Sequence, residues 1–272
     1  MKNENFYPLT LTRKVEDLRC GTRTVGEHGK QISYLWDLLV GLKEDLERDL
    51  KGQGSRPACR QAGVKGQVHP SVVLLAPENI LIEEGAEIEP LAVLDARSGP
   101  IYIGKKSVIK AHANLRGPVS IGPECKIGGE VSHSIFHGYS NKAHYGFIGH
   151  SYIGEWVNLG AGTTNSNLKN TYGTVKVWVN GKEVDSGQQF LGCFIGDHVK
   201  TGIGTLITTG AVIGVGAHWF GGGVTPKVIP NFAWGKEGKI KLEKMLAIAH
   251  SVMGRRQKKL SQEEENKLRN LY

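Results

Sequence analysis

A six-residue period runs through the middle of the chain and restricts its fold more than any other feature. Aliphatic residues occupy every sixth position from 103 to 127, and the same spacing returns from 195 to 219. An α-helix repeats every 3.6 residues and a strand every two, so neither element alone gives this spacing. The residues in register are Ile103, Ile109, Leu115, Ile121 and Ile127, then Ile195, Thr201, Ile207, Ile213 and Trp219.

This period is typical of a parallel β-helix, in which each short strand turns one aliphatic side chain inward and glycine permits the tight corners. Unrelated strands of a β-sandwich would not stay in phase over five consecutive hexads. We therefore predict a mainly β fold: a left-handed parallel β-helix, or hexapeptide solenoid, over residues 64–230, flanked by α-helices at both ends. Each coil leans on its neighbours, so the ends of the solenoid need caps, which the helical segments could provide.

Residues 1–63 form a short N-terminal segment before the solenoid. A short strand is predicted around 9–12. A single helix is predicted over 33–50 because leucines recur there at helical spacing, with Ser33 as a possible N-cap and Gly41 weakening the helix without ending it. The polar, glycine-bearing stretch 51–63 is predicted to be a linker.

Two further segments depart from the six-residue period. Residues 172–191 are predicted to leave the solenoid as an insertion, with a type I′ hairpin turn at Asn180 and Gly181. Residues 231–272 are predicted to form a helical tail. Its first helix would cover 236–253, and Ser261 with Glu264 would form a capping box for a last short helix.

Composition limits the compartment and the partners. The formal net charge of +8 suits phosphorylated small molecules as well as nucleic acid, but the basic run 255–259 lacks interleaved aromatics and is predicted to be a solvated helix face. The cysteines lie far apart without a CxxC pair, so neither a disulfide framework nor a zinc knuckle is expected. No signal peptide or membrane span is recognisable. We predict a cytoplasmic protein that contacts neither membrane nor nucleic acid.

Histidines are dense between 133 and 150, and two hypotheses account for them. In the first, His112, His144 and His150 approach the three-histidine zinc site that left-handed β-helix carbonic anhydrases form across subunits, although their separations differ. In the second, His144 is a single general base and no metal is bound. The small corner at 160–162 would then leave room for a narrow ligand. Side-chain amides that suit sugar hydroxyls follow at Asn158, Asn165 and Asn167.

Residues 144–167, HYGFIGHSYIGEWVNLGAGTTNSN, resemble the acetyltransferase domain of the bifunctional N-acetylglucosamine-1-phosphate uridylyltransferase/glucosamine-1-phosphate acetyltransferase family. The resemblance continues through VKVWVNGKEVDSGQQFLGCFIGDHVKTGIGT, nearest to the archaeal-type and alternative bacterial branches, and covers roughly 68–230. It implies acetyl-CoA as co-substrate, a small-molecule sugar phosphate as acceptor, a role in nucleotide-sugar (UDP-N-acetylglucosamine) biosynthesis, and a homotrimer with sites between solenoids.

The resemblance also implies roles for single residues. His144 falls on the catalytic base. Ala161, with Gly162 beside it, falls where the backbone faces the thioester, and Lys227 where a basic residue lies near the coenzyme A end. The implied contacts to the sugar or its phosphate are Glu130, Arg116, Asn158 and Asn167, with Lys142 as a possible substitute for a lysine that the family carries at the position of Ser132.

Two departures separate the chain from the family. Ser132 replaces that pocket lysine, and Phe147 replaces a tyrosine, so a charge and a hydrogen-bond donor are lost. The phrase YPLTLTRKVEDLRCG at 7–21 resembles the opening of the nucleotidyltransferase domain, but 1–63 is too short for that domain, and no uridylyltransferase activity is expected. We predict an acetyl-CoA-dependent N-acetyltransferase; the alternatives are a catalytically inactive oligomerisation module and a zinc carbonic anhydrase.

Overall fold

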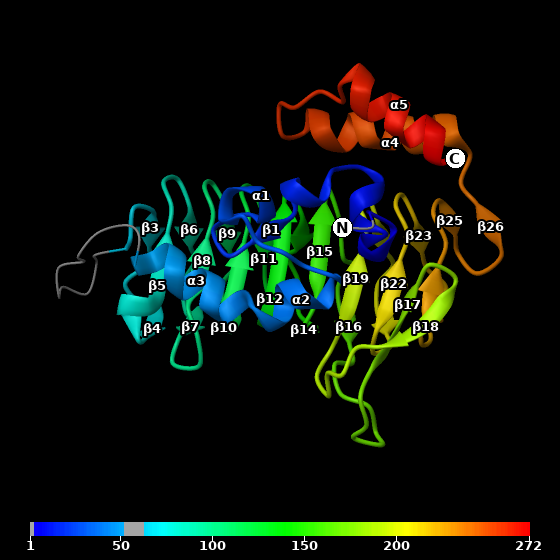
Figure 1. The fold of residues 1–272 in the computed structure, drawn as a ribbon. Helices are drawn as coiled ribbons and strands as arrows, with labels where there is room; N and C mark the ends of the chain where they lie inside the picture. The colour runs from blue at the N-terminus through cyan, green and yellow to red at the C-terminus, as the bar shows by residue number, and fades with distance from the viewer. Residues whose placement is uncertain (1–2, 52–62) are drawn as a thin grey trace.

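The computed structural model describes residues 3–51 and 63–272, and these form a parallel β-solenoid with three faces, shown along its length in Figure 1. The predicted fold class is confirmed. The five aliphatic residues in register from Ile103 to Ile127 are all 0 % exposed, and their counterparts from Ile195 to Trp219 are also buried. The linker predicted at 51–63 lies almost wholly outside the described residues.

The first face is built from short parallel strands that each contribute two or three residues. They are β4 (Val73–Leu75), β7 (Val93–Asp95), the first halves of β10 (Asn114–Ile121) and β12 (Glu130–Gly138), β14 (Phe147–Gly149), β16 (Thr164–Asn165) and β21 (Leu206–Ile207).

The second face follows each of these strands after one corner. Its strands are β5 (Ile80–Ile82), β8 (Ile101–Ile103), the second halves of β10 and β12, β15 (Tyr152–Glu155), β19 (Cys193–Ile195), β22 (Ala211–Ile213) and β24 (Val228–Ile229). A 3-10 turn at Pro77–Asn79 connects β4 to β5.

The third face closes the prism. It contains β3 (Gln67–Val68), β6 (Glu87–Ile88), β9 (Val108–Ile109), β11 (Lys126–Ile127), β13 (Asn141–Lys142), β20 (Lys200–Thr201), β23 (His218–Trp219) and β25 (Ala233–Trp234), with β26 (Gly238–Lys239) antiparallel at the end. The three edges of the prism are named here after His144 (third to first face), Asn167 (first to second) and Trp156 (second to third).

Coil length varies near the middle of the solenoid, and this removes the six-residue period there. Val108 pairs with Lys126, 18 residues on, whereas Lys126 pairs with Asn141 after 15 residues and Asn141 bridges Asn158 after 17. The solenoid therefore continues through the stretch around His144 with shortened coils. Within the segment predicted to leave the solenoid, β17 (Lys176–Val179) and β18 (Lys182–Asp185) form an antiparallel hairpin, and Asn180 and Gly181 both have positive φ, as a type I′ turn requires.

The N-terminal segment lies along the second face rather than over an end of the solenoid (Figure 1). Leu38, Leu39, Leu42 and Leu46 pack against outward side chains of that face, including Tyr102 and Tyr152. Its elements are the 3-10 helices Asn3–Phe6, Leu9–Leu11 and Val15–Asp17, the hairpin of β1 (Arg19–Cys20) and β2 (Arg23–Thr24), and the helices α1 (Val25–His28), α2 (Trp36–Val40) and α3 (Leu42–Lys51).

Three local predictions for this segment were wrong. The strand expected around 9–12 is a 3-10 helix. Gly41 does end the first helix, because its φ of −87° and ψ of 6° are not helical, and α3 starts afresh at Leu42. Ser33 is not an N-cap: its backbone N–H donates to the Asp37 carboxylate, and α2 begins only at Trp36.

The tail contains α4 (Leu242–Gly254) and α5 (Gln262–Leu271), which pack over Trp156, Val215 and Phe232. The capping box of Ser261 and Glu264 is confirmed, whereas α4 starts six residues later than predicted because β26 forms first. The basic run is not simply solvated. Arg256 donates to the backbone oxygen of Glu124 and to Asn141 Oδ1 at 2.8 Å, and Lys258 pairs with Glu124. No helix among the described residues is long and apolar enough to cross a bilayer.

Candidate functional site

The His144 corner brings together three of the predicted site residues. His144 lies in the turn between β13 and β14, and its side chain is exposed. The corner of the next coil, 160–163, stacks directly on it, because Gly162 N donates to Tyr145 O at 3.0 Å. Ala161 and Gly162 therefore lie one coil away from His144 on the same edge of the prism.

Only one backbone N–H of this next corner is free for a ligand within the described structure. Gly160 N donates to Thr201 Oγ1 at 3.0 Å, Gly162 N to Tyr145 O, and Thr163 N to Gly160 O at 3.1 Å. Ala161 N has no acceptor among the described residues. The sequence predicts a small corner at 160–162 with room for a narrow ligand; among the described residues, Ala161 is the one position of this corner whose N–H remains available.

Gly162 keeps this corner narrow, because a side chain there would crowd Tyr145 and require a strained backbone conformation. Its φ is +75°, a left-handed conformation that glycine adopts without strain. A Cβ at Gly162 would lie 3.3 Å from the ring of Tyr145, which is 70 % exposed and covers the corner.

Lys142 does not face the surface, contrary to its predicted role as a sugar contact. It stands at an inward position of the third face and is 1 % exposed. Its Nζ donates to Gly128 O at 2.9 Å and to His144 O at 2.7 Å. Burial lowers the pKa of this lysine to about 8. Lys142 thus lies beneath the His144 corner.

The predicted acidic and basic sugar contacts lie on the first face. Glu130 is exposed, pairs in register with Phe147, and its N–H donates to Gly146 O at 3.0 Å, so it adjoins the His144 corner. Arg116 is also exposed and pairs in register with Ser132 on the neighbouring strand. The position of the missing family lysine therefore lies beside an arginine.

Asn158 is exposed on the third face, one coil after Asn141. Its Oδ1 accepts from Asn141 Nδ2 at 3.3 Å, and Asn141 Oδ1 accepts from Arg256. The tail is therefore connected through Asn141 to one of the predicted sugar contacts. No sequence motif indicated this link.

Asn167 and Lys227 lie away from His144 within a single chain. Asn167 is at the next corner, where its Nδ2 donates to His150 Nδ1 at 2.9 Å, and His150 stacks on His133 and on Phe190. Lys227 precedes β24 on the same edge and lies 3.8 Å from Glu183 of the hairpin. The Asn167 corner therefore holds a second group of predicted site residues.

Asn165 is not available to a sugar, contrary to the sequence analysis. Its side chain points inward and is 2 % exposed. The side-chain amide accepts from Gly149 N at 2.8 Å and donates to Gly149 O at 3.0 Å. These two bonds take the place of backbone hydrogen bonds between neighbouring coils. This asparagine stabilises the solenoid.

The three histidines of the zinc hypothesis do not converge within the described chain. His112 and His144 lie on the same edge, whereas His150 lies at the Asn167 corner and binds Asn167. No group of three potential metal ligands was found in residues 3–51 and 63–272.

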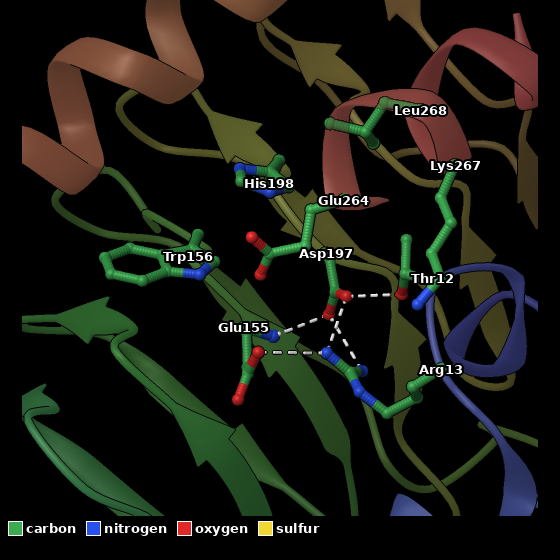
Figure 2. A pocket seen from close by; sticks show the side chains of 9 residues that line it. All are labelled: Thr12, Arg13, Glu155, Trp156, Asp197, His198, Glu264, Lys267 and Leu268. Carbon is green, nitrogen blue, oxygen red and sulfur yellow. Dashed lines mark hydrogen bonds and ion pairs between the residues drawn. The ribbon is translucent and has the colours of Figure 1, made fainter. Parts of the chain in front are cut away.

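A cluster that the sequence did not reveal lies where the N-terminal segment meets the Trp156 corner, as Figure 2 shows. Arg13 binds Asp197 through both nitrogens, at 3.0 and 2.6 Å, and Glu155 at 3.2 Å. The charge of Arg13 is thus neutralised by two carboxylates. The adjoining cavity of about 180 Å³ is also lined by His198 and by α5 residues.

Electrostatics in this cluster follow from burial and pairing. Burial alone would raise the pKa of Glu155, but the hydrogen bond from His137 and the charges of His137 and Arg13 outweigh it and lower the pKa to about 2. Burial lowers the pKa of His198 to about 4, and its Nδ1 has no partner in the described structure. We interpret the cluster as the anchor of the N-terminal segment.

Known proteins match more than half of the chain, although no family model matches. It is 42 % identical over 148 residues to the bifunctional sugar-1-phosphate nucleotidylyltransferase/acetyltransferase of Sulfurisphaera tokodaii, covering 53 % of this chain and 36 % of that protein. It is 32 % identical over 189 residues to the bifunctional protein GlmU of Methanocaldococcus jannaschii, covering 68 % and 42 %. These similarities confirm the resemblance inferred from the motifs.

The chain spans about two fifths of the length of the curated relatives it matches. Among solved structures, a hexapeptide transferase family protein from Anaplasma phagocytophilum matches with a TM-score of 0.35 and 12 % identity, covering 76 % of this chain and 93 % of that one.

Proposed function

We propose that the chain is an acetyl-CoA-dependent N-acetyltransferase acting on an amino-sugar phosphate such as glucosamine-1-phosphate. One observation carries the proposal: an exposed imidazole, His144, lies one coil from Ala161, whose N–H has no acceptor in residues 3–51 and 63–272, on a narrow edge of the solenoid. A proton acceptor and an N–H donor on neighbouring coils are the two groups that acyl transfer to an amine requires. The similarity to relatives named as acetyltransferases supports the same chemistry.

In the proposed reaction, His144 takes a proton from the sugar amine as the nitrogen attacks the thioester carbonyl of acetyl-CoA. The C–N bond forms, the C–S bond breaks, and the thiolate of coenzyme A accepts a proton. Ala161 N–H donates to the carbonyl oxygen while negative charge develops on it, an effect that in other enzymes is worth about a hundredfold or more in rate per donor. No metal takes part in this step.

The acceptor site is proposed to lie between copies of the chain in a homotrimer. The N-terminal segment covers the second face, and the tail contacts part of the third face through Arg256 and Asn141. The first face and the rest of the third face therefore remain for self-association. The sugar contacts proposed on these two faces are Glu130, Arg116 and Asn158, whereas Asn167 and Lys227 lie on another edge than His144. A neighbouring copy would bring the second group beside the first.

Ser132 and Phe147 bear on which amino sugar the site accepts. Both are outward positions of the first face, next to Arg116 and Glu130. With serine in place of lysine, Arg116 is left as the positive side chain of this row for a sugar phosphate. We propose that a phosphorylated amino sugar binds here with fewer direct charges than in the relatives.

The test is release of thiol from acetyl-CoA with a panel of amino sugars and their phosphates. Wild type should acetylate a panel member, and His144→Gln should lose at least a hundredfold in kcat. His112→Gln is the matched control, because His112 is an exposed histidine on the same edge of the prism and should behave as wild type. An inactive wild type that forms a stable trimer without binding acetyl-CoA would support the alternative of an oligomerisation module.

A further inference from the structure

Lys142 occupies a position that aliphatic residues fill in neighbouring coils. In the third face it pairs in register with Ile127, which pairs with Ile109, and both isoleucines are 0 % exposed. Leu159 takes the inward position in the next coil and is 2 % exposed. Lysine is almost never fully buried unless paired, because its ammonium loses its hydration. Its presence among aliphatic residues calls for a specific contact.

That contact is with the corner that carries His144. The Lys142 Nζ donates to His144 O at 2.7 Å and to Gly128 O at 2.9 Å, so it joins the corners of two successive coils from inside the prism. Both acceptors are neutral carbonyls, and none of the ion pairs found in the described ranges includes Lys142. Its charge is therefore held beneath the corner without a countercharge in contact.

The corner is closed tightly around this ammonium. A Cβ at Gly129 would lie 2.9 Å from both Lys142 Nζ and His144 O, and 2.7 Å from Gly146 O. The next coil stacks on the other side through the bond from Gly162 to Tyr145. The backbone at His144 is thus held between a buried cation on one side and the Ala161 corner on the other.

We propose that Lys142 is a positioning residue for acyl transfer: it fixes the backbone of His144 from inside the solenoid and keeps the imidazole aligned with Ala161. The inference rests on the proposed function, since it assigns Lys142 to the same site. It replaces the role of direct sugar contact. A displacement of about 1 Å at a reacting group costs on the order of a hundredfold in rate, so a buried hydrogen bond can affect turnover without touching substrate.

The chain offers a matched control in Lys200. This lysine is half-buried. It donates to Trp156 O at 2.6 Å and His198 O at 3.2 Å, and burial of its ammonium lowers its pKa to about 8. It supports the Trp156 corner, not the His144 corner. Lys142→Met and Lys200→Met therefore both remove an ammonium that donates to two backbone carbonyls, and they differ in which corner loses its hydrogen bonds.

The experiment compares kcat, KM and hydrogen exchange of these two variants in the full chain. Lys142→Met should lower kcat at least tenfold with both KM values within twofold, and should speed amide exchange in 143–147; Lys200→Met should leave kcat within twofold. If Lys142→Met does not fold, Lys142→Leu, which copies the residue of the next coil, takes its place.

Two results would overturn the inference: a kcat for the Lys142 variant within twofold of the Lys200 variant, or unchanged exchange in 143–147. Failure of the proposed function is distinguishable. If wild type acetylates no amino sugar, that proposal fails, while the exchange comparison alone still decides whether Lys142 fixes the His144 corner.

Discussion

The Arg13 guanidinium binds Asp197 through two nitrogens, 3.0 and 2.6 Å from the two carboxylate oxygens, and this pair ties the N-terminal segment to the solenoid. Asp197 is additionally bound by the hydroxyl of Thr12 at 2.5 Å and by the N–H of Glu155 at 2.7 Å. Both side chains of the pair are buried, with 10 % and 5 % exposure. The pair therefore joins two parts of the chain that are far apart in sequence.

Replacing Arg13 by methionine should destabilise the protein strongly. The variant leaves the Asp197 carboxylate buried without its cation, and breaking a buried pair in this way costs about 3–5 kcal/mol. Urea denaturation measures the loss. Arg97→Met is the control, since Arg97 is largely exposed beside Asp95 and such pairs contribute about 1 kcal/mol or less. Equal losses for the two variants would contradict the anchoring role of Arg13.

Gly146 should not tolerate alanine. Its φ is +120°, and a Cβ would lie 2.2 Å from Thr163 O. Gly204→Ala separates the two effects, because Gly204 has φ of +67° but open space around a Cβ. In Gly204→Ala the free energy of unfolding should fall by about 1–2 kcal/mol from the left-handed conformation alone. In Gly146→Ala it should fall further, because of the added steric contact. Thermal melting of both variants would show whether the steric contact at the His144 corner matters.

His150 should orient the Asn167 amide. In His150→Phe the ring stack with His133 and Phe190 can persist, but the acceptor for Asn167 Nδ2 is lost. A neutral hydrogen bond is worth about 1 kcal/mol, so kcat/KM for the acceptor sugar should fall by roughly fivefold. His133→Phe preserves the stack without touching Asn167. Steady-state kinetics giving the same values for both variants would argue against the orienting role.

Acid should weaken the fold before the carboxylates titrate. The pKa of His198 is about 4 in the folded chain against 6.5 in the unfolded chain, because burial disfavours the charged form. Between pH 6.5 and 4 the unfolded chain therefore binds more protons. The contribution of His198 to the free energy of unfolding is fully present above pH 6.5 and declines toward pH 4, by up to roughly 3 kcal/mol.

The variant His198→Asn should flatten the pH dependence of stability. His198 and His112 both have φ of +60°, a conformation that asparagine tolerates, and His112 is exposed. Urea denaturation between pH 7.5 and 4.5 should give a shallower slope for His198→Asn than for His112→Asn. Parallel slopes would mean that His198 accepts its proton as readily when folded as when unfolded.

Alkaline pH should reveal an effect of the same sign for Lys142, in a higher pH window. Burial lowers its pKa to about 8 in the folded chain from 10.5 in the unfolded chain. Between these values the unfolded chain binds more protons, so stability should rise with pH by up to roughly 3 kcal/mol from this lysine. Lys142→Met should be at least as stable as wild type at pH 7.5 and lose that rise, whereas Lys259→Met at an exposed position should retain it.

The regular coils could be predicted from sequence because every inward position there repeats at six residues. The prediction weakened between Ile127 and Ile195, where coils of 15 and 17 residues and the hairpin excursion shift the phase. Asn165 and Lys142 occupy inward positions in this stretch. Because both residues are polar, the hydrophobic pattern did not indicate the strands that continue the solenoid there. Hydrophobic period alone cannot identify a coil whose interior is completed by side-chain hydrogen bonds.

The candidate site was predicted in part. The placement of His144 beside Ala161 follows from their separation of one coil, which the motif preserves. The inward turn of Lys142 could not be foreseen, because it depends on which side of the two-residue strand β13 its side chain takes. The pairing of Arg13 could not be foreseen either, because Asp197 lies 184 residues further along the chain. Only the folded chain brings these partners together.

The packing of the N-terminal segment on the second face also imposes an order on folding. Its leucines, at positions 38–46, are buried by side chains such as Tyr102, Tyr152 and Phe194, which belong to coils synthesised much later. Contacts of such long sequence separation form slowly, because the intervening chain must first be organised. The N-terminal segment emerges from the ribosome early with its apolar side uncovered, and it reaches its final place only after the coils beneath it have stacked.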